Sequence, residues 1–207
     1  MDALPFTAQL INVFAAVLLL LSFAMLAQRR ILSLVDLLAW QGAALVGSTL
    51  AVAYSTGQQH LYYSAALTLA LKVILVPLVL HRLIRRLAVR WDTEPLLNIP
   101  ATMIVGLALV VFSFGLAQPI SALASTVTRS TLGIAIAVVM LSFLMMITRR
   151  KAISQVIGFL AMENGLFFAA TSATYGMPMV VELGVALDVL VGVVILGISF
   201  FQIREQF

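Results

Sequence analysis

Long apolar runs alternate with short polar or basic segments along the whole chain. A helix needs about twenty mostly apolar residues to cross the hydrocarbon core of a bilayer, which is roughly 30 Å thick. Because no linker or low-complexity segment interrupts the pattern, we expect an all-α, polytopic fold and a single integral membrane domain over residues 1–207. The pattern predicts seven transmembrane helices, at about 4–27, 31–54, 61–81, 96–117, 130–147, 152–174 and 179–203.

Composition supports this interpretation and excludes several kinds of chemistry. The chain is 63% hydrophobic and only 10% charged, whereas about a quarter of the residues in a soluble domain are charged. It has no cysteine, which excludes disulfides, iron–sulfur clusters and thiol catalysis. The two histidines, His60 and His81, fall in a loop and at a helix end, so no pair of haem or zinc ligands is expected inside the membrane. We therefore expect no cofactor.

The distribution of basic residues predicts the orientation in the membrane. Positive charge concentrates in the cytoplasmic loops of membrane proteins. Arg129 falls between predicted helices four and five, on one side of the membrane. Ten other basic residues follow predicted helices one, three, five or seven, on the opposite side. This distribution predicts an external N-terminus and a cytoplasmic C-terminus, in the inner cell membrane. The positive net charge is then explained by membrane orientation, and no nucleic-acid binding is expected. The ten residues are Arg29, Arg30, Arg82, Arg85, Arg86, Arg90, Arg149, Arg150, Lys151 and Arg204.

Two pairs of short matches indicate an internal repeat. LLAWQ at 37–41 aligns with FLAME at 159–163, and ALKV at 70–73 aligns with ALDV at 186–189. If predicted helices one to three and five to seven are copies, the single connecting helix makes them parallel repeats. The repeat would make Gln41 equivalent to Glu163, and Lys72 equivalent to Asp188.

Ionisable residues in the predicted spans are the strongest functional signal. Lys72, Glu163 and Asp188 lie near the midpoints of predicted helices three, six and seven. Each such group costs roughly 2.5–3.5 kcal/mol at the centre of a membrane helix, so these residues are functional candidates. Glu182 and Asp36 lie nearer the two membrane faces.

Two interpretations of these charges are open. In the first, they form a polar path for protons or small cations, because buried acids and bases can exchange protons. In the second, Lys72 forms a static ion pair with Glu163 or Asp188 that holds helices together. Pro77, five residues after Lys72, is expected to kink helix three. The candidate path residues are Lys72, Glu163, Asp188, Glu182, Asp36, Gln41 and Asn164.

Three segments resemble a known family. RRKAISQVIGFLAMENG at 149–165, VVELGVALDVLVGVVILGI at 180–198 and ALKVILVPLV at 70–79 look like hydrogenase-4 component E, a membrane subunit of complexes related to formate hydrogenlyase and complex I. The last three predicted helices are also similar to the K-type (4L) subunit of complex I and to the C subunit of multisubunit cation/proton antiporters.

The resemblance implies a non-catalytic subunit whose partners are other membrane subunits, including antiporter-like ones, and membrane lipid. Glu163 would stand for the key glutamate of helix six, with Lys72 and Asp188 as polar neighbours. The sequence departs from the K-type pattern at one point. Glu163 follows the pair Ile157–Gly158 about one helical turn later than the glutamate of that pattern does. The alternatives are a cation/proton antiporter, alone or as one component, and a purely structural membrane scaffold.

Overall fold

The computed structural model describes residues 6–86, 98–121 and 126–174. These residues are helical, apart from short connections. The third span contains a π-helical segment, η1, between two α-helical parts. The elements in chain order are α1 (Phe6–Ala27), α2 (Ile31–Thr56), α3 (Gln59–Thr68), η1 (Leu69–Leu75), α4 (Val76–Arg86), α5 (Ile99–Ser121), α6 (Thr126–Thr148) and α7 (Ala152–Thr174).

Six helices in the described part of the chain are long and apolar enough to cross a membrane. They correspond to the first six predicted spans, and α3, η1 and α4 together make the third. The protein is therefore a multi-pass helical membrane protein. The seventh predicted span, at 179–203, lies outside the described residues.

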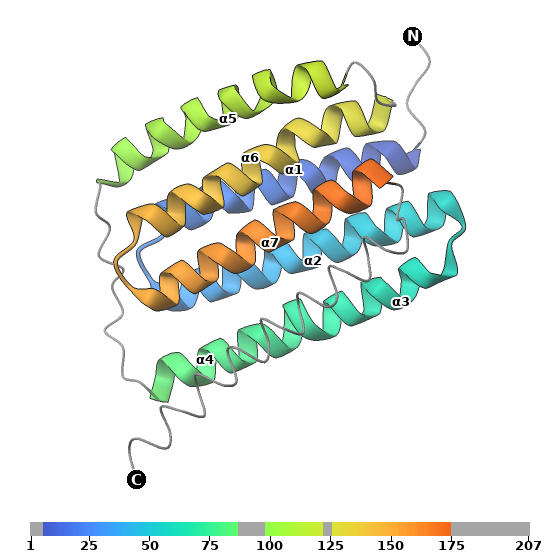
Figure 1. Cartoon of the computed structure of the whole chain (residues 1–207). Coiled ribbons are helices and arrows are strands. Elements are labelled where there is room, and N and C mark those ends of the chain that lie inside the picture. Colours follow the sequence, from blue (N-terminus) through green and yellow to red (C-terminus); the bar gives the residue numbers. More distant parts are fainter. Residues whose placement is uncertain (1–5, 87–97, 122–125, 175–207) are drawn as a thin grey trace.

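The helices run side by side in a layered bundle (Figure 1). The helical hairpins α1–α2 and α6–α7 pack against each other, through α1 on α6 and α2 on α7. The continuous helix α3–η1–α4 packs on α2 at one flank, and α5 packs on α6 and α1 at the other. Only 17% of the α5 span is buried, against 56% of the α2, α6 and α7 spans, so α5 presents most of its apolar surface outward.

Small residues allow the α6–α7 pair to approach closely. A Cβ atom at Gly158 would lie 2.8 Å from Met146, and one at Gly165 would lie 2.9 Å from Val138. Because real Cβ atoms do not approach other atoms so closely, these positions need glycine at the present separation. This is the small-residue packing typical of membrane helices.

One end of the bundle carries most of the described basic residues, and we call it the basic end (Figure 1). There the buried Arg149 donates from Nη2 to the carbonyl oxygens of Leu26, at 2.8 Å, and Gln28, at 2.9 Å. Its cation therefore caps the C-terminal end of α1. Burial, and then the nearby charge of Arg29, lowers the pKa of Arg149 below its usual value. The basic end is defined by Arg29, Arg30, Arg82, Arg85, Arg149, Arg150 and Lys151.

The opposite end contains the turn between α2 and α3. Gly57 ends α2 in the left-handed conformation, with φ of 67°, and its N–H donates to the carbonyl oxygen of Ala53. Glycine adopts this conformation without the penalty that a Cβ atom imposes. The α2–α3 turn therefore returns the chain antiparallel along α2, which brings the middle of the third span beside the middle of the second.

Candidate functional site

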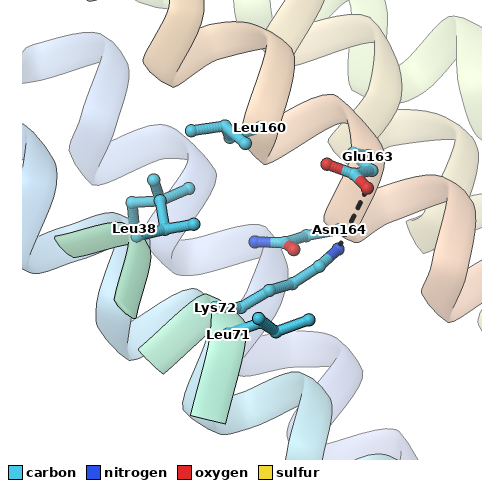
Figure 2. Close-up of a pocket in the computed structure, with 7 residues that line it drawn as sticks. Leu38, Leu71, Lys72, Leu160, Glu163 and Asn164 are labelled. Atoms are coloured by element: carbon cyan, nitrogen blue, oxygen red, sulfur yellow. Dashed lines mark ion pairs between the residues drawn. The ribbon is translucent and has the colours of Figure 1, made fainter. Parts of the chain in front are cut away.

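Lys72 and Glu163 form an ion pair inside the bundle. Lys72 Nζ lies 3.7 Å from Glu163 Oε1, and the two side chains are 7% and 3% exposed. Lys72 comes from η1 and Glu163 from α7, two elements that both pack on α2 (Figure 2). The structure therefore brings together two of the charged residues that the sequence placed near the membrane midplane.

The helix that carries Lys72 is locally distorted. In η1, the N–H of Val76 donates to the carbonyl oxygen of Leu71, five residues back, instead of the usual four. The distortion stands directly before Pro77, where the sequence predicted a kink, and the helix continues beyond it as α4. Single π-helical turns occur often at functional sites.

Gly42 on α2 allows the backbone at Lys72 to pack close to α2. A Cβ atom at Gly42 would lie 3.3 Å from both Lys72 Cβ and Val73 Cγ2. The backbone of α2 thus lies close to η1, and the lysine stem passes beside it toward α7 (Figure 2). A larger residue at this position would displace the base of the lysine side chain.

A chain of amide and hydroxyl groups extends the polar region across the bundle. Asn164 Nδ2 donates to Gln41 Oε1 at 3.2 Å, and Gln41 Nε2 donates to Ser22 Oγ at 3.0 Å. Ser22 in turn donates to the carbonyl oxygen of Leu18 at 2.9 Å. Asn164 lines the same small cavity as Lys72 and Glu163, so this chain runs from beside the ion pair to α2 and α1. Buried polar groups in such a network rigidify the packing when their hydrogen bonds are satisfied.

A small cavity adjoins the ion pair (Figure 2). Its volume is about 10 Å³, which is the size that holds one water molecule when polar groups line the space. The Lys72 ammonium also lies 5.5 Å from the centre of the Phe167 ring, within reach of a cation–π contact. The cavity is lined by Leu38, Leu71, Lys72, Val76, Leu160, Glu163 and Asn164.

The remaining candidate residues are placed differently. Asp36 is 64% exposed at the basic end, where its Oδ1 lies 3.4 Å from His81 Nε2. His81 Nδ1 lies 2.9 Å from the carbonyl oxygen of Pro77, and since a carbonyl only accepts, Nδ1 carries the proton there. Asp36 therefore belongs to a second, more exposed pair that is separate from the buried one.

Glu182 and Asp188 lie outside the described residues. Sequence reasoning missed Ser22, Phe167 and the partnership of His81 with Asp36. The available signal was weak, because single hydroxyl or aromatic residues in an apolar helix are common. Asp36 and His81 come together only because the second and third spans pack antiparallel, which the sequence does not show directly.

Fold and site together define the class: a multi-pass helical membrane protein with a buried ion pair inside the bundle. Among the described residues, no three His, Asp or Glu side chains gather in a way that could hold a metal ion.

Comparison with known proteins gives the family. The chain is 33% identical over 199 residues to the uncharacterized protein Rv0085 of Mycobacterium tuberculosis (strain ATCC 25618 / H37Rv), which covers 96% of this chain and 90% of that protein. The chain belongs to the same family as this mycobacterial protein.

A more distant likeness is to hydrogenase-4 component E of Escherichia coli (strain K12), which is 28% identical over 140 residues. This match covers 67% of the chain and 64% of the relative, and hydrogenase-4 component E of Shigella flexneri matches to the same extent. No family model and no solved structure matches the chain.

Proposed function

We propose that the protein is a non-catalytic membrane subunit of a complex I-like hydrogenase or related oxidoreductase of the inner membrane, in the family of hydrogenase-4 component E. Its role is to contribute buried charged residues to a path for protons or another small cation. The distant similarity to hydrogenase-4 component E supports the assignment to such a complex. The single observation that carries the role is the ion pair of Lys72 and Glu163, buried among membrane-spanning helices.

The chemistry of this pair suits proton exchange. A carboxylate and an ammonium at 3.7 Å are close enough for direct exchange after a small side-chain movement, and the adjoining cavity has room for one water beside them. Gln41 and Asn164 supply further hydrogen-bonding groups beside Glu163. We extend the path to Asp36 at the basic end, and to Asp188 and Glu182 on sequence grounds.

The orientation predicted from the sequence completes the proposal. We place the basic end in the cytoplasm, because positive charge concentrates in cytoplasmic loops. The N-terminus is then external, and the six described helices with the predicted seventh put the C-terminus in the cytoplasm. The partners would be antiporter-like and other membrane subunits of the assembly, with lipid around α5.

The test separates proton transfer from assembly. The variant Glu163→Gln keeps the shape of the side chain but removes its exchangeable charge. The chain should first be purified with its associated subunits in mild detergent, and the intact complex then reconstituted in liposomes. We expect Glu163→Gln to assemble but to lose proton translocation driven by the complex's own electron donor.

Two matched variants complete the experiment. Glu163→Asp restores the carboxylate and should recover part of the translocation, while Glu94→Gln makes the same chemical change in the polar segment between the third and fourth spans and should leave it unchanged. Normal translocation by an assembled Glu163→Gln complex would reject the proposed role.

A self-sufficient cation/proton antiporter and a purely structural scaffold are the competing functions. Ion-dependent proton flux through the purified chain alone in liposomes would favour the antiporter. Altered assembly with unchanged translocation in the Lys72 and Glu163 variants would favour the scaffold.

A further inference from the structure

Three buried hydroxyl groups near the ion pair make no hydrogen bond within the described part of the chain. They are Ser48 on α2, with 0% exposure, and Ser64 and Thr68 on α3, with 5% and 0%. Other buried hydroxyls here donate to the carbonyl four residues back, for example Thr49 to Leu45 at 2.9 Å and Ser142 to Val138 at 2.8 Å. Buried hydroxyls without a protein partner are usually satisfied by bound water.

The three hydroxyls lie on one side of the ion pair, toward the α2–α3 turn. Ser64, Thr68 and Lys72 follow one another at intervals of four residues, so they line one side of the third span. Ser64 is eight residues before Lys72, a rise of about 12 Å at 1.5 Å per residue. On α2, Gly42 lies beside Lys72 and Gly57 ends the helix at the α2–α3 turn. Ser48 therefore lies at a height in the bundle between the ion pair and this turn.

A further orphaned acceptor marks the end of this series. Gln58 Oε1, in the α2–α3 turn, is buried and has no hydrogen-bond partner in the described residues. α7 runs parallel to α2 in the bundle, so Thr171, seven residues beyond Asn164, reaches the same level as Ser48 (Figure 1). Polar groups therefore occur at successive levels from the ion pair to the turn, on α3 at Ser64 and Thr68, on α2 at Ser48 and on α7 at Thr171. Ser48 shares the face of α2 that carries Gln41, seven residues earlier.

The other side of the ion pair is apolar. Between the ion pair and the basic end, the buried side chains of α2, α4 and α7 belong to one hydrophobic cluster. Ser154, a further buried hydroxyl without a described partner, lies at the start of α7, so that this cluster separates it from Glu163. We call the following residues the apolar layer: Leu34, Leu38, Val76, Leu80, Ile157 and Leu160.

We propose that Ser48, Ser64 and Thr68 bind water and form an access path from the Lys72–Glu163 pair to the side of the membrane where the α2–α3 turn lies. The apolar layer separates the pair from the basic end in this structure, although Leu38, Val76 and Leu160 also line the small cavity beside the pair. Continuation of the path to Asp36 therefore requires this layer to open. A hydroxyl group both donates and accepts a hydrogen bond, so a series of hydroxyls and waters can conduct a proton or hydrate a small cation. The inference rests on the proposed function and gives its path a direction.

The absence of cysteine from the chain allows a direct test. Ser64→Cys, Thr68→Cys and Ser48→Cys each exchange a hydroxyl for a thiol of similar size. Sealed membrane vesicles of either orientation, carrying the full complex, are treated with Ag⁺ in nitrate buffer. Ag⁺ binds thiols and is small enough to follow water. After the ion is washed away, the protein is denatured and remaining thiols are labelled with a maleimide.

Controls define the two sides and the background. Gln59→Cys, in the exposed first turn of α3, reports the turn side, and Arg150→Cys reports the basic side. Leu80→Cys, in the apolar layer, and Ser142→Cys, on α6 away from the proposed path, are buried positions that should keep full maleimide labelling after treatment from either side.

We expect Ag⁺ on the turn side to abolish maleimide labelling of Ser64→Cys, Thr68→Cys and Ser48→Cys, and Ag⁺ on the basic side to leave it intact. Full labelling after treatment from both sides, or protection from the basic side, would overturn the access path. The two α3 variants are independent, so loss of folding in one leaves the other as a test. The readout needs no proton transport: protection together with normal translocation by Glu163→Gln would reject the proposed function and keep the access path.

Discussion

The buried pair of Lys72 and Glu163 should be strongly coupled in the folded protein, and a double-mutant cycle measures that coupling. The single variants are Lys72→Met and Glu163→Gln, which keep most of the side-chain volume, and the third variant carries both changes. Removal of one partner leaves the other as a buried charge, whereas removal of both leaves neither.

The geometry sets the expected magnitude. Two unit charges 3.7 Å apart attract by about 4.5 kcal/mol at an effective dielectric constant of 20. A change in protonation of the remaining group reduces the penalty in each single variant. We therefore expect each single change to lower the free energy of unfolding by about 3 kcal/mol. The double change should cost less than the sum of the two, with a coupling energy of about 2 kcal/mol.

The assay is reversible unfolding in mixed micelles as the fraction of denaturing detergent rises, followed by circular dichroism. Asp36 and His81 supply a matched control pair at a pH where the imidazole is protonated, because their atoms are 3.4 Å apart but the side chains are 64% and 28% exposed. Exposed pairs contribute about 0–1 kcal/mol, so the control cycle should show little coupling. Equal, small coupling energies in both cycles would refute the view that burial makes the Lys72–Glu163 pair strong.

Three further variants probe the surroundings of the site and the basic end. Gly42→Val should lower the free energy of unfolding by about 1–3 kcal/mol, since a Cβ atom there already meets the π-helical segment at 3.3 Å, whereas Gly115→Val, with nothing within 4 Å, should not. Gln41→Leu should cost about 1–3 kcal/mol in the same assay, because the Asn164 amide loses its acceptor. Arg149→Ala should cost about 3 kcal/mol by leaving the carbonyls at the end of α1 uncapped, and Arg149→Lys should restore only part of this, because a lysine cannot reach several carbonyls in a fixed fork.

The positions of the helices could be predicted from the sequence because the bilayer imposes one strong rule. A spanning segment must satisfy its backbone internally and expose apolar side chains, so a run of about twenty apolar residues suffices to identify it. The first predicted span, 4–27, became Phe6–Ala27, and the sixth, 152–174, became Ala152–Thr174. The third, 61–81, was extended at both ends and interrupted by η1, because periodicity in an almost wholly apolar segment carries no information about hydrogen-bond register.

The candidate site could be predicted only as a set of residue types. Charges near the midplane were expected to form a polar path or a static pair, and the pair would join Lys72 to Glu163 or Asp188. The structure pairs Lys72 with Glu163 through helix packing that apolar composition does not encode, and Asp188 lies outside the described residues. Gln41 was named as a candidate because the internal repeat aligns it with Glu163. In the structure it is held by hydrogen bonds to Ser22 and Asn164, which no linear sequence pattern reveals.

The geometry of the Lys72–Glu163 pair itself argues for exchange over a purely structural link. A charge-assisted hydrogen bond between an ammonium and a carboxylate is normally about 2.7–2.9 Å long. Here the separation is 3.7 Å, the lysine stands on a π-helical turn, and a cavity for one water adjoins both groups. In the proposed function, such a pair exchanges a proton with a water in the adjoining cavity without any helix moving.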